Sequence, residues 1–175
     1  MDQAVVRTPP YFDFDLLREQ TAELARAHAG QDTQMRAALV EFLKPYVDQA
    51  RAFAKAQLED DGDGRACAAG LSAFQDELIR LGYDFTTRHV YRAENPSTSE
   101  RMAVVAQGGY GRSLLAPGSD IDLLFLLPYK QTAWGESVAE YILYLLWDLG
   151  FTVGHAARTI SQCLRLSRAD MTIRT

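Results

Sequence analysis

The first half of the chain carries apolar residues at steps of three and four, which is the spacing of an amphipathic helix. Three such runs occur. The first ends before Gly30, the second follows a predicted capping residue at Asp32 or Thr33, and the third follows the acidic segment 59–64. The spacing predicts three helices with apolar faces formed by Phe14, Leu17, Thr21 and Leu24, by Met35, Leu39, Phe42 and Leu43, and by Leu71, Phe74, Leu78 and Ile79.

Two features interrupt this helical pattern. Pro45 falls inside the second run, and proline lacks an N–H and clashes with the preceding turn, so a kink or break is predicted there. The segment E-D-D-G-D-G at 59–64 has the composition of a calcium loop. If Asp61 and Asp63 held positions three and five of such a loop, Gly70 would stand where a bidentate glutamate is required. The segment is therefore predicted to be a solvated acidic turn.

After the polar segment E-N-P-S-T-S-E at 94–100, short apolar runs alternate with helical spacing. Strands are predicted for M-A-V-V-A-Q at 102–107, for the apolar run that follows S-D-I-D, and for F-T-V-G-H-A at 151–156. We expect an α/β (α+β) fold, with a helical N-terminal region at 1–94 and a core with a small mixed sheet at 95–175. Two helices are expected in this core. The first ends at Gly150 and has an apolar face formed by Trp134, Val138, Tyr141, Leu145 and Leu149. The second is short and begins at a T-x-x-Q capping box of Thr159 and Gln162.

Composition narrows the class of protein. The 175 residues are 47% hydrophobic, enough for one sizeable core or two small lobes. No apolar run reaches the roughly 18 residues of a membrane span, and the N-terminus lacks a signal-peptide pattern, so a cytoplasmic protein without a membrane partner is expected. Cys67 and Cys163 are expected to be reduced thiols, and the three scattered histidines form no zinc cluster. A net charge of -5 argues against nucleic acid as a partner.

The S-D-I-D sequence places two carboxylates at the mouth of a predicted strand. Side chains alternate faces along a strand, so Asp120 and Asp122 should point the same way while Ile121 and Leu123 point the other. Two like charges repel each other, and a bound divalent cation relieves the repulsion. Magnesium favours a few carboxylates together with substrate phosphates. The alternative is that Asp120 caps the preceding turn and that Asp122 is merely solvated.

The sequence G-G-Y-G-R follows the first predicted strand. Glycines let the backbone approach a ligand, and a helix beginning near Gly109 to Gly111 would direct its amide groups and positive dipole end at phosphates, with Arg112 as an added cation. The alternative is a strand-to-helix turn that needs positive φ. The segment lacks the G-x-G-x-x-G spacing of dinucleotide folds and the G-K-[ST] ending of a P-loop, so another phosphate-binding scheme is required.

Taken together, strand, G-G-Y-G-R, a short helix with Leu115, and P-G-S-D-I-D-L-L-F resemble the nucleotidyltransferase domain of the DNA polymerase beta type. Within that superfamily, these blocks are most similar to the bacterial uridylyltransferases that modify the PII nitrogen-signalling protein. The resemblance implies transfer of UMP from UTP to a tyrosine of PII, with pyrophosphate leaving. It also implies catalytic and metal-binding roles for Asp120 and Asp122 with Mg²⁺, or Mn²⁺ in its place, and nucleotide binding by Gly108, Gly109, Arg112 and Ser119.

The resemblance continues more weakly through Gly154, His155, Arg158 and Thr159. For His155 a structural hydrogen bond is favoured over catalysis, because metal-assisted phosphoryl transfer has no obligate need of an imidazole. For Arg158 the expected role is a surface ion pair. Neither residue is assigned a catalytic role.

A third carboxylate is normal in this superfamily, and the sequence does not place it. The strand predicted at 151–156 has no acid. Glu136, Glu140 and Asp148 fall on a predicted helix and should face solvent. Asp170 is the later candidate, with the N-cap of a further helix as its expected role. The other alternative is a position beyond Thr175.

Two other functions remain open at this point. One is a non-catalytic nucleotide-sensing or partner-binding module that keeps the fold without the third acid. The other is an adenylyltransferase of the same superfamily.

Overall fold

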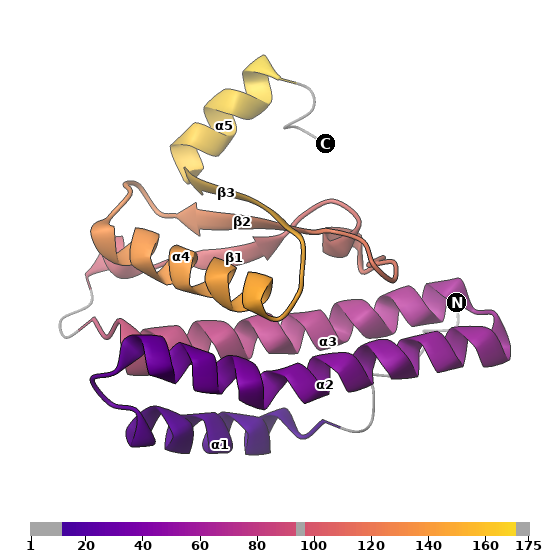
Figure 1. Ribbon diagram of the computed structural model, residues 1–175. Helices are drawn as coiled ribbons and strands as arrows, with labels where there is room; N and C mark the ends of the chain where they lie inside the picture. Colours follow the sequence, from indigo (N-terminus) through magenta and orange to yellow (C-terminus); the bar gives the residue numbers. More distant parts are fainter. Residues whose placement is uncertain (1–11, 94–96, 171–175) are drawn as a thin grey trace.

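Figure 1 shows the computed structural model of the chain, which describes residues 12–93 and 97–170. Three helices, α1 to α3, lie side by side along one side of the molecule. A fourth helix, α4, lies between them and a small sheet, and α5 extends away from the sheet on the opposite side. The expected combination of helices with a small mixed sheet is confirmed.

The helical part consists of α1 (Phe14–Ala27), α2 (Asp32–Asp61) and α3 (Gly64–Phe85), and α3 continues into a π-helix, η1 (Thr86–Val90). The predicted cap at Asp32 or Thr33 was wrong, because α2 begins directly after Gln31 and both residues lie in its first turn. Gly30, at φ 79°, turns the chain two residues before Asp32, so the helix can begin at Asp32.

Helix α2 runs through Pro45 without a break, and the kink predicted as the alternative stays a prediction. Pro45 is exposed, and so is Glu41, whose carbonyl loses its helical partner because proline has no N–H. On the solvent side, water can bond to this carbonyl. The helix therefore tolerates the proline there.

The acidic segment forms the expected turn between two helices. Gly62, at φ 68°, ends α2, and its N–H donates to Leu58 O at 3.0 Å. The Asp63 carboxylate then caps α3 by accepting hydrogen bonds from the N–H groups of Arg65, at 3.1 Å, and Ala66, at 2.9 Å. These acids therefore serve helix termination and capping.

The sheet contains β1 (Ala103–Ala106), β2 (Ile121–Leu127) and β3 (Val153–Thr159) in the order β1-β2-β3. Strands β1 and β2 are antiparallel, whereas β2 and β3 are parallel and are joined by the crossover helix α4 (Ala133–Asp148). Strand β3 extends beyond the predicted Ala156 to Thr159. The capping box of Thr159 and Gln162 then opens α5 (Ile160–Ala169), as predicted.

One face of β2 lies in the core, and the other is more open. Ile121, Leu123, Phe125 and Leu127 are each at most 2% exposed. On the opposite face Asp122 is exposed and Leu126 is half-buried. The buried apolar residues form one continuous cluster that includes residues of α1, α2, α3 and α4 together with Ile121, Leu123 and Phe125 of the central strand. The core therefore joins the helical part to the sheet.

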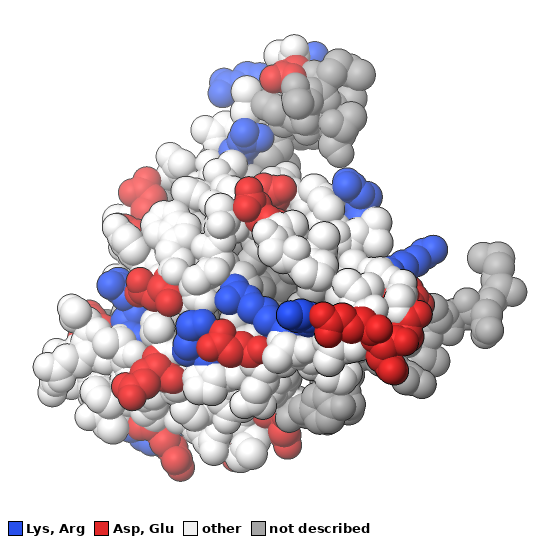
Figure 2. Space-filling model, turned by 45° about the vertical axis from the view of Figure 1, so that its right-hand side comes forward, with Lys and Arg blue, Asp and Glu red and all other residues white. Residues whose placement is uncertain are grey.

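Charged side chains of both signs lie next to one another across the helical part on the face shown in Figure 2. Helix α2 contributes two ion pairs at i,i+4 spacing, Lys44 with Asp48 at 2.6 Å and Lys55 with Glu59 at 3.8 Å. No continuous basic surface appears on this face. Within residues 12–93 and 97–170, no helix combines the length and hydrophobicity that crossing a bilayer takes.

Candidate active site

Asp122 is the exposed second residue of β2, and its carboxylate fits between two glycines. A Cβ added to Gly108 would lie 2.6 Å from Asp122 Oδ2, and one added to Gly154 would lie 2.5 Å from Oδ1. Gly154 is the register partner of Asp122 on β3, and Gln107 N–H donates to Asp122 O at 2.9 Å. The strand pairing thus places the Asp122 carboxylate against Gly108 and Gly154, where the side chain of any other residue would collide with it.

A hollow of about 770 Å³ opens at the Asp122 carboxylate, beside the end of β1 and the first half of β3. Its lining includes the guanidinium-bearing residues Arg112 and Arg158 and the imidazole of His155, with Asp122 as its acid. Guanidinium groups pair with phosphate oxygens, and an exposed carboxylate attracts a cation. The hollow therefore contains a carboxylate that can bind a metal ion and guanidinium groups that can bind the phosphates attached to it.

The glycine turn reaches this hollow through Gly108, which has φ 59°. The expected helix near Gly109 to Gly111 is a single 3₁₀ turn, η3 (Tyr110–Arg112). It stops because Ser113 takes the left-handed conformation and its N–H donates back to Tyr110 O at 2.9 Å. Gly108 therefore satisfies the alternative prediction of a positive-φ turn, while a long helix with its dipole directed at the hollow is not formed.

Two polar contacts tie the turn to α3. The buried Tyr110 hydroxyl donates to Asp76 Oδ1 at 2.7 Å, and burial together with this hydrogen bond raises the pKa of Tyr110 above its ordinary value. The N–H of Leu115, a buried residue in the loop after η3, donates to Ser72 Oγ at 3.1 Å. The expected short helix with Leu115 is thus a loop held by α3.

The structure brings Gly108, Arg112 and Asp122 together at the hollow, but not the other predicted site residues. Gly109 accepts the N–H groups of Arg112 and Leu114 and shapes the turn. The Ser119 hydroxyl donates to Ala116 O at 2.9 Å, and Ser119 lines a separate cavity.

Asp120 is exposed and comes immediately before β2, outside the lining of the hollow. Its alignment with Asp122 on one face stays a prediction.

The exposed carboxylate of Asp122 suits a magnesium ion. In the part of the chain that the structure describes, no donor bonds to the carboxylate of Asp120 or Asp122, so their oxygens are available. No group of three metal-ligating side chains occurs in those ranges. Magnesium is commonly held by one or two carboxylates together with substrate phosphates and water. The Asp122 carboxylate therefore fits this ion if substrate phosphates and water supply the other ligands.

The acids weighed as a third ligand lie elsewhere. Glu136, Glu140 and Asp148 are exposed on α4, as predicted, and Asp148 pairs with Arg36 at 3.3 Å. Asp170 is the C-cap of α5, its N–H donating to Leu166 O at 2.9 Å, and the further helix that it is predicted to cap lies outside the described residues.

Strand β3 supplies lining residues that sequence reasoning did not assign to the site. Gly154 gives space to Asp122, and Arg158 is half-buried at the hollow. Within the described ranges no carboxylate reaches ion-pair distance of Arg158, so the expected surface ion pair does not form. His155 packs edge-on against Trp147 at 6.1 Å between ring centroids. The four-residue spacing of Gly154 and Arg158 was the signal available, because an even spacing places both on one strand face.

Comparison with known proteins gives close matches to part of much longer chains. The chain is 60% identical over 152 residues to a bifunctional uridylyltransferase/uridylyl-removing enzyme of Bradyrhizobium sp., a match covering 87% of this chain and 16% of the relative. Relatives with the same name from Rhodopseudomonas palustris and Caulobacter vibrioides are 55% and 52% identical, over 94% and 93% of this chain and 18% and 17% of their own length.

The chain thus spans about a sixth of the length of these curated relatives. No family model matches the chain. No solved structure matches it either.

Proposed function

Since the chain is related over nearly its whole length to part of the bifunctional uridylyltransferase/uridylyl-removing enzymes, we propose that it carries the nucleotidyltransferase site of such an enzyme. The proposed reaction transfers UMP from UTP to a tyrosine hydroxyl of the PII signalling protein. The tyrosine hydroxyl releases its proton to solvent as its oxygen forms a bond to the α-phosphorus, the bond from that phosphorus to the bridging oxygen breaks, and pyrophosphate leaves with the electron pair.

The observation that supports this proposal most strongly is the position of the Asp122 carboxylate. Its carboxylate lies between Gly108 and Gly154, in a hollow that also contains two arginines. A structural aspartate would be expected to accept hydrogen bonds or to pair with a cation, and within the described ranges Asp122 does neither. The arrangement suits a carboxylate that receives its partner from solution.

Each lining residue has a role that follows from its chemistry. Asp122 and Asp120 would hold Mg²⁺, or Mn²⁺ in its place, and this ion would neutralise charge on the phosphate oxygens during in-line displacement. Arg112 and Arg158 would pair with phosphate oxygens and orient the triphosphate. Gly108 would leave room for the Asp122 carboxylate that holds the ion, because a Cβ there would lie 2.6 Å from its Oδ2.

The experiment measures magnesium-dependent UMP transfer to purified PII by the 175-residue chain, together with UTP binding by calorimetry. Asp122→Asn keeps the shape of the side chain and removes its charge, so both signals should be lost while the circular dichroism spectrum is unchanged. Glu140→Gln, an exposed acid on α4, is the matched control and should behave like the unsubstituted chain. Near-full activity of Asp122→Asn would contradict the assignment.

One observation favours a second candidate, a nucleotide-sensing module without catalysis. The described residues contain no group of three metal-ligating side chains, whereas enzymes of this superfamily are expected to use a third acid. UTP binding that depends on Asp122 without any transfer would favour this function. Preference for ATP over UTP would instead favour an adenylyltransferase.

A further inference from the structure

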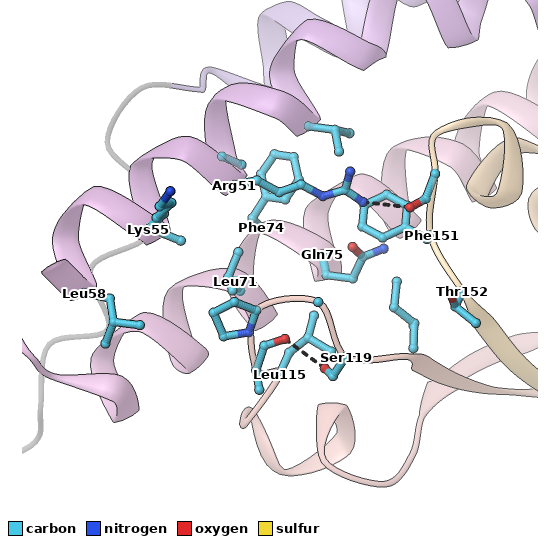
Figure 3. Close-up of a pocket in the computed structure, with 18 residues that line it drawn as sticks. Arg51, Lys55, Leu58, Leu71, Phe74, Gln75, Leu115, Ser119, Phe151 and Thr152 are labelled. Carbon is cyan, nitrogen blue, oxygen red and sulfur yellow. Dashed lines mark hydrogen bonds between the residues drawn. The ribbon is translucent and has the colours of Figure 1, made fainter.

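A second cavity, of about 410 Å³, lies on the other side of the segment that leads to Asp122. Helices α2 and α3 form one side of it, and the loop 115–119 and the chain around Phe151 form the other (Figure 3). Ser119 and Ile121 face this cavity, whereas Asp122 faces the hollow described above. The two spaces therefore have separate linings.

The walls of this cavity are mostly apolar. They are formed by Leu58, Leu71, Phe74, Leu115, Ile121 and Phe151, among others. Among the described residues, no aspartate or glutamate lines it, and its cationic side chains there are Arg51 and Lys55 of α2. Its volume falls within the range of roughly 300–1,000 Å³ that small-molecule sites occupy. The lining suits an occupant with an apolar body and a negative charge.

Gln75 supplies an unused donor in this cavity. Its side chain is 1% exposed, yet its Nε2 has no hydrogen-bond partner among the described residues. Figure 3 shows the Gln75 side chain reaching from α3 toward Phe151 and Thr152. A buried amide without a partner is costly, and a ligand acceptor would relieve that cost.

Arg51 is held at the same cavity with donors to spare. Its Nη2 donates to Gly150 O at 3.0 Å, and its guanidinium carbon lies 4.6 Å from the centroid of the Phe151 ring. A guanidinium has five N–H donors, and within the described ranges only this one hydrogen bond is formed. The stacking on Phe151 orients the group, so its other donors are available to a carboxylate.

We propose that this cavity binds a small carboxylate with an apolar body, whose head pairs with Arg51, whose body lies against Leu71, Phe74 and Phe151, and which supplies an acceptor to Gln75. This binding does not depend on the proposed transferase function, because its residues are separate from the Asp122 hollow. It can therefore be tested without turnover.

The test titrates the 175-residue chain with octanoate, kept below its micelle-forming concentration, and with the neutral octanamide and the short acetate. Calorimetry gives the affinities, and amide chemical shifts give the location. Octanoate should bind saturably and about tenfold more tightly than octanamide, because a charged head forms the stronger hydrogen bonds. Acetate should not bind measurably. The shifted amides should include those of Gly118 and Thr152, which line the cavity.

Two substitutions separate the head group from the buried donor. Arg51→Gln should weaken octanoate binding about tenfold and leave octanamide unchanged. Gln75→Met keeps the side-chain volume and removes the unpaired amide, so it should weaken octanoate about fivefold while the unliganded chain melts no lower than before. Arg65→Gln, an exposed arginine of α3 outside the cavity, is the control and should change neither.

Three results would overturn the proposal. The first is no saturable octanoate binding. The second is equal affinity for octanoate and octanamide with no effect of Arg51→Gln. The third is a set of shifted amides that lies away from Gly118 and Thr152. Amide spectra of both variants report that each is folded, so a loss of binding can be assigned to the missing group.

Discussion

At the residue scale, the position of Asp122 depends on two neighbours that have no side chain. The proximity of Gly108 was suggested by the sequence, because G-G-Y-G-R ends one predicted strand and S-D-I-D begins the next along the chain. The role of Gly154 was not, because it follows from the parallel register that pairs it with Asp122. Register between strands that are far apart in sequence depends on packing and cannot be obtained from a single chain's pattern.

Gly154→Ala should displace the Asp122 carboxylate without unfolding the chain. The added Cβ would lie 2.5 Å from Asp122 Oδ1, and this oxygen is the end of a rotatable side chain, so the side chain will move first. Magnesium-dependent UTP binding, measured by calorimetry, should weaken at least about tenfold, as for other disturbed metal ligands. The melting temperature should change little.

Gly64→Ala is the matched control for this substitution. An added Cβ there would meet only Leu58 Cδ1, at 4.0 Å, and Gly64 begins α3. This variant should keep UTP binding and gain up to about 1 kcal/mol of stability, since alanine has less backbone freedom to lose. Unchanged magnesium-dependent UTP binding in Gly154→Ala would show that the position of the Asp122 carboxylate does not matter for metal binding.

At the element scale, periodicity predicted the long helices and the capping box of α5, since both depend on residues close in sequence. Two local predictions failed, and the break predicted as one alternative at Pro45 did not occur. The exposed backbone beside Pro45 keeps α2 intact, Ser113 ends η3 after one turn, and Gly30 starts α2 one residue early. Such outcomes depend on hydration and on the conformations of single residues, which apolar spacing does not report.

Glu77→Gln should weaken the attachment of α1 to α3 in a pH-dependent way. Burial acts to raise the pKa of Glu77, but hydrogen bonds from Arg18, at 2.7 Å, and from Arg80 outweigh it and lower the pKa below its ordinary value of 4.5. The ion pairs therefore stabilise the fold above pH 4.5, and this contribution is lost as the pH falls through the lower folded value. Urea denaturation at pH 7 should show a loss on the order of 1 kcal/mol, shrinking toward acid pH.

Glu23→Gln serves as the comparison for this measurement. Glu23 pairs with Arg26 at 3.8 Å within α1, and both side chains are largely exposed. Its substitution should change the free energy of unfolding by less than that of Glu77, because solvent screens the pair. A Glu77→Gln penalty that is the same at pH 7 and below pH 4 would refute the titration argument.

At the scale of the whole molecule, the helices and the sheet share one apolar core. The sequence suggested a helical region at 1–94 and a sheet-bearing core at 95–175, since a polar segment separates them. The continuous cluster of buried residues crosses that division, and Gly82 of α3 lets Leu145 of α4 approach closely. The apolar face of a helix predicts that the helix packs against other elements, but it does not predict which elements these are.

Leu145→Ala should destabilise both parts together. Leu145 is 1% exposed and lies against α3, so its truncation leaves a cavity that costs about 3 kcal/mol. Urea transitions followed by far-ultraviolet circular dichroism and by tryptophan fluorescence should coincide and shift equally. Leu164→Ala on α5, where the side chain is 57% exposed, should have little effect. Separate midpoints for the two signals would show two independently folding units.

The parallel pairing of β2 with β3 also has a consequence for the order of events during refolding. Each of the helices α1 to α3 forms from contacts near in sequence, whereas Asp122 and Gly154 are paired across the intervening helix α4. Parallel strands need such a crossover before they can hydrogen-bond, and distant pairings form slowly. Affinity for a cation should therefore return later than helicity when the denatured chain is diluted into buffer.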